Sequence, residues 1–224
     1  MKESQNQLSQ SFTVIALITL SGGLQDAYSY FCRGGVFANA QTGNIVLLSA
    51  SLVSGNYDES VKYLISLVSF VLGAMTAKTL SFVMEKTKHV FWKQTVLFVE
   101  TAALTGAAFI PQEMNLFANA LVSFACAMQV LTFDKIYGNS FASTMCIGNV
   151  VRLSDQLISA IVRKDEVALK TSGLYFAVVI TFAIGASIGY LLQKTFSDYT
   201  ILFSAALIFT AALMFFFVGS RNYV

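Results

Sequence analysis

Long apolar stretches, separated by short polar ones, run along almost the whole chain of 224 residues. Several approach the roughly 20 residues that a helix needs to cross the hydrocarbon core of a bilayer. The first apolar run has no clear small-residue cleavage site, so we expect a retained span and not a removed signal peptide. The pattern predicts membrane helices at residues 12–31, 61–84, 91–110, 114–133, 172–193 and 199–219.

Two further stretches differ because each contains a Gly-Asn pair that follows polar residues. The first covers about residues 36–53 and contains Gly43-Asn44, and the second contains Gly148-Asn149. In each we expect extended chain followed by a short helix. The first short helix would begin at Ile45, with Thr42 or Asn44 as its cap, and Gly43 would permit the tight turn before it.

The order of these stretches repeats along the chain. Gln25 aligns with Gln129, and the two Gly-Asn pairs align in nearly the same register. The further matches are Leu97, Phe98 and Thr105 with Leu202, Phe203 and Thr210, and Gly73-Ala74 with Gly185-Ala186 after an insertion in the charged loop 163–166. We therefore expect one integral membrane domain made of two repeat halves, residues 1–112 and 113–224.

The Gly-Asn segments decide the expected topology. If each enters and leaves by one face, the protein has six full spans plus two re-entrant or short helices, and its halves are inverted. If each crosses fully, there are eight spans and the halves point the same way.

Cationic side chains favour the cytoplasmic side of a membrane. With the N-terminus inside, the six-span arrangement leaves outside only Arg33, Lys62 and Lys194. The eight-span arrangement leaves outside Lys2, Lys62, Arg163, Lys164, Lys170 and Arg221. We therefore favour an all-α polytopic membrane helix bundle with an inverted two-fold repeat, in the bacterial inner or plasma membrane with a cytoplasmic N-terminus. Eight spans remain the alternative.

The composition agrees with a membrane protein. Hydrophobic residues make up 56% of the chain and charged residues 12%, whereas soluble domains carry about 25% charged residues. A net charge of +2 without a basic stripe argues against a nucleic-acid partner. Cys32, Cys126 and Cys146 lack metal-ligand spacing, and no nucleophile-and-base grouping appears, so we expect no metal, no cofactor and no enzyme.

Polar residues within the apolar stretches form the candidate site. Asp26 is costly in hydrocarbon and should face the bundle interior or a water-filled cavity; the structural alternative is a buried ion pair with Arg33. Exposed amides at the start of each short helix would bind anions or polar groups near the middle of the membrane. The complete candidate set is Gln25, Asp26, Asn39, Thr42, Gly43, Asn44, Glu100, Gln129, Gly148 and Asn149.

Small residues mark a close helix contact. Gly185 and Gly189 share one helix face, and Gly73 and Ala77 repeat the pattern in the first half. Such faces let two helix backbones approach closely. We expect this packing within the chain, although the same faces would also allow a homo-oligomer.

One part of the sequence resembles a known family. The run Gly23-Leu24-Gln25-Asp26-Ala27, followed by Gly34-Gly35-Val36-Phe37 and Thr42-Gly43-Asn44, resembles the YoaK-like family of small multi-pass bacterial membrane proteins. The second-half motifs of that family correspond here to Ala127-Met128-Gln129-Val130 and Ile147-Gly148-Asn149, which offer fewer polar groups. The resemblance implies the membrane class and the importance of the motif, but no substrate.

Together these patterns predict a small transporter or channel for a small polar or anionic solute, with its site at the paired Gly-Asn helix ends. The alternative is a non-transporting membrane assembly or sensor protein whose polar groups only hold helices together. The expected partners are the lipid bilayer and a small polar solute or ion.

Overall fold

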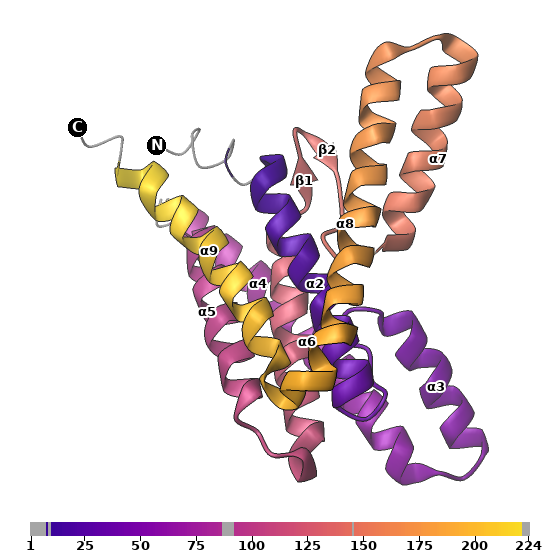
Figure 1. Ribbon diagram of the computed structural model, residues 1–224, viewed down its shortest axis with the longest axis vertical. Helices are drawn as coiled ribbons and strands as arrows, with labels where there is room; N and C mark the ends of the chain where they lie inside the picture. Colours follow the sequence, from indigo (N-terminus) through magenta and orange to yellow (C-terminus); the bar gives the residue numbers. More distant parts are fainter. Residues whose placement is uncertain (1–7, 9, 87–91, 145, 221–224) are drawn as a thin grey trace.

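Helices dominate the computed structural model, which describes residues 8, 10–86, 92–144 and 146–220, without the side chains of residues 85, 86 and 216–220. The expected all-α class is confirmed, since the two strands form only a two-residue antiparallel pair after α6. The elements in chain order are α2 (Phe12–Cys32), α3 (Gln41–Val53), α4 (Tyr57–Lys86), α5 (Trp92–Ala108), η1 (Gln112–Met114), α6 (Asn115–Thr132), β1 (Lys135–Ile136), β2 (Asn139–Ser140), α7 (Cys146–Arg163), α8 (Glu166–Phe196), η2 (Ser197–Thr200) and α9 (Ile201–Ser220) (Figure 1).

Every predicted span coincides with a helix, but some ends differ from the prediction. Residue 91, the expected start of one span, lies outside the described residues. Helix α8 begins six residues before the expected Ser172 because Asp165 caps it, accepting from Val167 N at 2.8 Å and Ala168 N at 3.1 Å. The charged loop therefore supplies the start of the helix. With 30 and 31 residues, α4 and α8 are each about 45 Å long, which exceeds a hydrocarbon core of about 30 Å.

Three helical stretches of the described chain are long and apolar enough to cross a membrane: Tyr57–Met84, Gln112–Thr132 and Glu166–Phe215, the last of which combines α8, η2 and most of α9. Helix α2 is not one of these three stretches, and its second half carries Gln25 and Asp26. It lies against α8, α9 and α6, and most of its residues from Val14 to Ser29 are buried. Because α2 mainly contacts protein, it can carry polar side chains that a lipid-facing helix could not.

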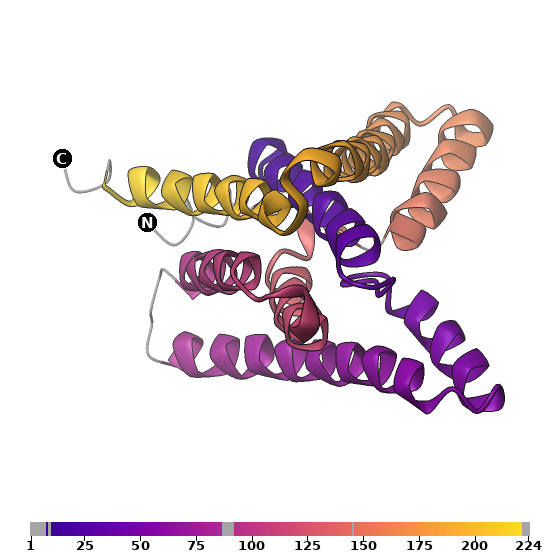
Figure 2. The same cartoon turned by 60° about the horizontal axis from the view of Figure 1, so that its bottom comes forward.

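The helices form two groups, one built around α2 and the other around α6 (Figure 2). On one side α2 packs against α8 and α9, and on the other α6 packs against α4 and α5. Helix α5 also packs on α9, which joins the two groups. The hairpins α3/α4 and α7/α8 extend toward opposite ends of the molecule (Figure 1).

Glycines bring α8 and α2 close together. A β-carbon on Gly185 would overlap the carbonyl oxygen of Leu20, and one on Gly189 would lie 2.9 Å from the Ala27 side chain. The predicted contact of these glycines within the chain is therefore confirmed. The α4/α6 contact is built in the same way, because a β-carbon on Gly73 would overlap the carbonyl oxygen of Phe124.

The segment between α2 and α3 runs back alongside α2. Ala38 N donates to Ser29 Oγ at 3.0 Å, and Asn39 N donates to Asp26 Oδ1 at 2.7 Å. The side chain of Asn39 donates from Nδ2 to Gly22 O at 3.3 Å, still further back along α2. Helix α3 therefore begins beside the middle of α2 and not at its end.

The expected start and cap of α3 are wrong. The helix begins at Gln41 and not at Ile45, and its N-cap residue, Ala40, makes no side-chain cap bond. Backbone carbonyls satisfy the first amides instead, since Gln41 N donates to Asn39 O at 2.8 Å and Gly43 N donates to Ala40 O at 2.9 Å. With these bonds made in the turn itself, a polar cap at Thr42 or Asn44 is not required.

Candidate functional site

Two loop tips, from the segments before α3 and before α7, meet on the same part of α2. Asn39 of the first loop bonds to Gly22 O. Thr144 of the second loop lies against Gly22, where a β-carbon would overlap its methyl group. Gln129 of α6 holds the second loop in place, donating to Ser143 Oγ at 3.1 Å and to Ile18 O at 3.3 Å.

Several oxygen atoms on these two loops and on helices α2 and α6 have no hydrogen-bond partner. Within the described residues, Asn39 Oδ1, Gln129 Oε1, Thr144 Oγ1 and Thr19 Oγ1 are all buried and unpaired. Most buried polar side-chain atoms in proteins have at least one partner, so a group of exceptions requires an explanation. With the carboxyl group of Asp26 nearby on α2, these atoms can accept hydrogen bonds from a molecule or ion held between the loops.

Asn44 and Asn149 fasten the two loops to the helices that follow. Asn44 accepts from Phe37 N at 3.0 Å and donates to Phe37 O at 2.7 Å. Asn149 makes the same pair of bonds to Ala142, at 3.2 Å and 2.7 Å. In each case the asparagine bonds to the residue seven positions earlier. These side chains therefore hold their own loops and do not point freely into a pathway.

A second polar group lies where α2, α5, α6 and α9 meet. Gln25 donates from Nε2 to Glu100 Oε1 at 3.1 Å, and it accepts from Cys126 Sγ at 2.7 Å. The hydroxyls of Ser21 and Ser204 lie 2.6 Å apart, and both are about 3 Å from Gln25 Nε2. All five side chains are buried, so this network is closed to solvent.

Glu100 is the least satisfied member of that network. Its Oε2 atom is buried without a partner, and neither of the two ion pairs found among the described residues involves it. A buried carboxyl group without a cation is costly in a membrane protein, and such groups commonly have a role in moving ions or protons.

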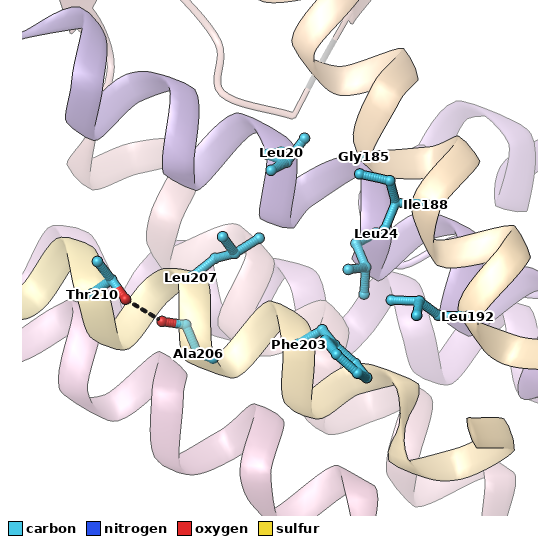
Figure 3. A pocket seen from close by; sticks show the side chains of 9 residues that line it. All are labelled: Leu20, Leu24, Gly185, Ile188, Leu192, Phe203, Ala206, Leu207 and Thr210. Carbon is cyan, nitrogen blue, oxygen red and sulfur yellow. Dashed lines mark hydrogen bonds between the residues drawn. The ribbon is translucent and has the colours of Figure 1, made fainter. Parts of the chain in front are cut away.

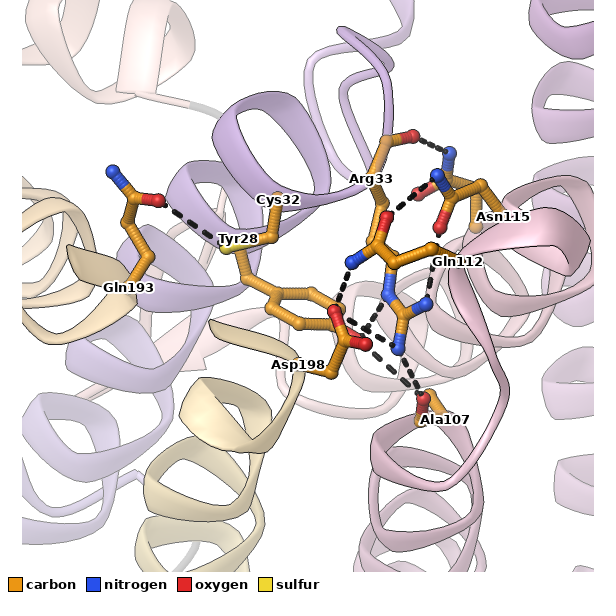
Figure 4. A network of polar contacts seen from close by, with 9 residues as sticks. Tyr28, Cys32, Arg33, Ala107, Gln112, Asn115, Gln193 and Asp198 are labelled. Atoms are coloured by element: carbon orange, nitrogen blue, oxygen red, sulfur yellow. Dashed lines mark hydrogen bonds and ion pairs between the residues drawn. The ribbon is translucent and has the colours of Figure 1, made fainter. Parts of the chain in front are cut away.

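Arg33 occupies one end of the bundle (Figure 4). Its guanidinium donates to Tyr28 Oη at 2.6 Å, to Asn115 Oδ1 at 3.0 Å and to Ala107 O at 3.0 Å. Its ion-pair partner is Asp198 in η2, at 3.7 Å. The alternative interpretation of Asp26, a buried ion pair with Arg33, is therefore wrong, because Asp26 faces the loop that contains Asn39.

The remaining predicted site residues lie outside these groups. Thr42 is exposed. Gly43 lies against the ring of Phe37, and Gly148 lies beside the guanidinium of Arg152. No group of three or more His, Cys, Asp and Glu side chains in the described part of the chain is arranged to hold a metal ion.

Sequence reasoning missed Thr144, Thr19 and the serines of the Gln25 network. Thr144 could have been found, because the register that aligns the two Gly-Asn pairs also aligns Asn39 with Thr144. Ser204 gave no such signal. It is a single hydroxyl in an apolar helix, and its role depends on which helix lies opposite.

Residues 14–214 match the family described as "Protein of unknown function (DUF1275)". The chain is also 24% identical over 209 residues to the UPF0700 transmembrane protein YoaK of Bacillus subtilis (strain 168), covering 88% of this chain and 90% of that protein. No solved structure matches the chain. The resemblance noted from the motifs is thus confirmed over most of the sequence.

Proposed function

The chain belongs to the DUF1275 family and is similar to a transmembrane protein over most of its length, and we propose that it is a small transporter or channel whose solute passes the point where the two loop tips meet on α2. The observation that carries this proposal is the set of buried oxygens without partners, from Asn39, Gln129, Thr144 and Thr19. A bound solute would supply the missing hydrogen bonds, because a buried acceptor left unpaired costs about 1–3 kcal/mol.

The unpaired atoms favour a solute that donates hydrogen bonds. An amide oxygen can only accept a hydrogen bond. The nitrogens of Asn39 and Gln129 already donate to backbone carbonyls of α2, so the oxygens are the groups left for a solute. Asp26 adds a carboxyl group on the same helix. A small polar donor or a small cation fits this set better than an anion, because amide, hydroxyl and carboxyl oxygens all carry partial or full negative charge.

An inverted repeat is part of the proposal, and corresponding contacts in the two halves support it. Exchanging the halves turns the α2/α8 contact into the α6/α4 contact, and both pairs are in contact. The glycine contacts of Gly185 and Gly73 correspond in the same way, as do the bonds that Asn44 and Asn149 make to their loops. Inverted repeats place solute sites near the midplane, at broken helices.

Six spans with two re-entrant segments suit this repeat. The segment before α3 runs back along α2 to Gly22, and α3 then extends toward the same end of the molecule as the C-terminal end of α2 (Figure 1). At 13 residues, α3 is about 20 Å long, which is too short to cross about 30 Å of hydrocarbon. We place the N-terminus in the cytoplasm of a bacterial cell and the protein in the cell membrane.

A second candidate function has its own support. Asn44 and Asn149 bond to the backbone of their own loops, and Asn44 also donates to Ser66 of α4. The Arg33 network joins segments from both halves. Such bonding suits a non-transporting membrane assembly or sensor protein, in which polar groups hold helices together.

Permeability of proteoliposomes tests the two candidates, with glycerol, urea and methylammonium as probes. Wild-type protein is compared with Asp26→Asn and Thr144→Val, and the matched control is Thr79→Val, because Thr79 is an exposed threonine that bonds only within its own helix. We expect faster entry of at least one probe with wild type and with Thr79→Val, and reduced entry with both site variants. Entry that both site variants leave unchanged would remove this site from the pathway. Probe entry equal to that of protein-free liposomes would favour the second candidate.

The topology has a separate test in intact cells, using single cysteines in a chain without its native cysteines. Gly55→Cys lies between α3 and α4, and Lys164→Cys lies between α7 and α8. We expect an impermeant thiol reagent to label Gly55→Cys from outside and Lys164→Cys only after permeabilisation. Labelling of both positions from the same side would contradict the inverted arrangement.

A further inference from the structure

An apolar groove of about 320 Å³ opens between α8 and α9, with α2 as its floor (Figure 3). The only polar side chain in its lining is Thr210, whose hydroxyl already donates to Ala206 O at 2.8 Å. The groove therefore offers hydrocarbon contacts and no free polar group. Its lining consists of Leu20, Leu24, Gly185, Ile188, Leu192, Phe203, Ala206, Leu207 and Thr210.

The groove is continuous with the lipid-facing surface. Ile184 and Leu191 of α8 are 49% and 62% exposed, and Phe209 of α9 is 43% exposed. In a membrane protein, such exposed apolar side chains on long apolar helices contact the acyl chains of the bilayer. A molecule that enters the groove from its open side therefore comes from the hydrocarbon region and not from water.

Different side chains stand at the positions of the other half that correspond to Leu20 and Leu24. In the register that aligns Gln25 with Gln129, Leu20 and Leu24 correspond to Phe124 and Met128. Those two side chains belong to a packed apolar cluster between α4, α5 and α6, completed by Leu80, Ala77, Trp92 and Val96. Under the proposed repeat, the half that contains α4, α5 and α6 therefore has Phe124 and Met128 where the groove between α8 and α9 has Leu20 and Leu24.

We propose that the groove binds one acyl chain of a membrane phospholipid. Lipid tails are as apolar as the lining, so the hydrophobic effect gives no preference for the groove over the bulk bilayer. The preference comes from dispersion contacts, because a chain in the groove touches close-packed atoms of three helices, whereas an empty groove forfeits those contacts. The bound chain lies over Leu20 and Leu24, where the other half carries Phe124 and Met128.

Photo-crosslinking in liposomes tests this site, with a phospholipid that carries a diazirine near the end of one acyl chain. Mass spectrometry then maps the labelled residues. We expect label on the groove-lining residues of α8 and α9 to exceed, several-fold, the label on exposed apolar residues of α4. The double variant Leu20→Phe, Leu24→Met introduces the side chains of the other half into the groove and should abolish the excess. The control Leu72→Phe adds an aromatic ring on α4, where Leu72 is 51% exposed, and should leave the excess unchanged.

A second variant covers the case in which the double variant fails to fold. Ala206→Leu narrows the groove from α9 at an exposed position, and it should also abolish the excess label. Labelling of wild type that is no stronger in the groove than on α4 would overturn the proposal. So would an excess that persists in a folded groove-filling variant. The readout is lipid labelling, so it is independent of whether any solute is transported.

Discussion

Replacing Arg33 with a neutral residue should destabilise the protein far more than replacing Asp198, its ion-pair partner. The Arg33 side chain is fully buried, and it donates three hydrogen bonds, to Tyr28, Asn115 and Ala107. Arg33→Met removes all three and leaves the three acceptors without the donor. A hydrogen bond from a charged donor contributes about 1.5–3 kcal/mol, so losing three costs about 4 kcal/mol or more. For a chain of this length that corresponds to a fall in Tm of about 10 °C.

Asp198→Asn should have a much smaller effect. The ion pair is 3.7 Å long and the Asp198 side chain is 23% exposed, so it is worth at most about 1 kcal/mol. Asparagine also keeps an oxygen that can accept from Gln112, as Asp198 does. Lys62→Met is the control, because it removes a partly exposed ion pair with Glu59. Thermal unfolding in detergent, followed by far-UV circular dichroism, measures the three shifts. Equal shifts for Arg33→Met and Asp198→Asn would refute the view that hydrogen bonds, and not the ion pair, give Arg33 its role.

Three further predictions concern stability, measured in the same way. Asn44→Ala and Asn149→Ala should each cost about 1–3 kcal/mol, because each removes both bonds to a loop backbone; a neutral result for both would mean that these bonds do not hold the loops. Gly185→Ala should destabilise by about 1–3 kcal/mol, because its methyl group would overlap the α2 backbone, whereas Gly173→Ala, with open space around it, should leave Tm unchanged or raise it. Glu100→Gln should change stability by no more than about 1 kcal/mol, since no ion pair is lost; a large loss would point to a cation partner for Glu100.

The sequence alone determined where the long helices lie. Every expected span became a helix because the apolar length needed to cross a bilayer is a local property that can be counted along the chain. It also identified the Gly-Asn segments, the family resemblance and the polar residues of α2, because Asp26 and Gln25 are conspicuous in an apolar stretch. The close glycine contact at Gly185 followed from spacing on one helix face.

Only the tertiary structure decided which of these polar groups meet. Arg33 pairs with Asp198 and not with Asp26, which is nearer in sequence. The end of α2 packs beside η2, whereas Asp26 faces the loop that contains Asn39. Thr144 reaches Gly22, and Ser204 reaches Gln25, across helices that are distant in sequence. The start of α3 moved from Ile45 to Gln41 because carbonyls of the preceding turn satisfied its first amides. Partners of this kind depend on how helices pack, and hydropathy carries no information about that packing.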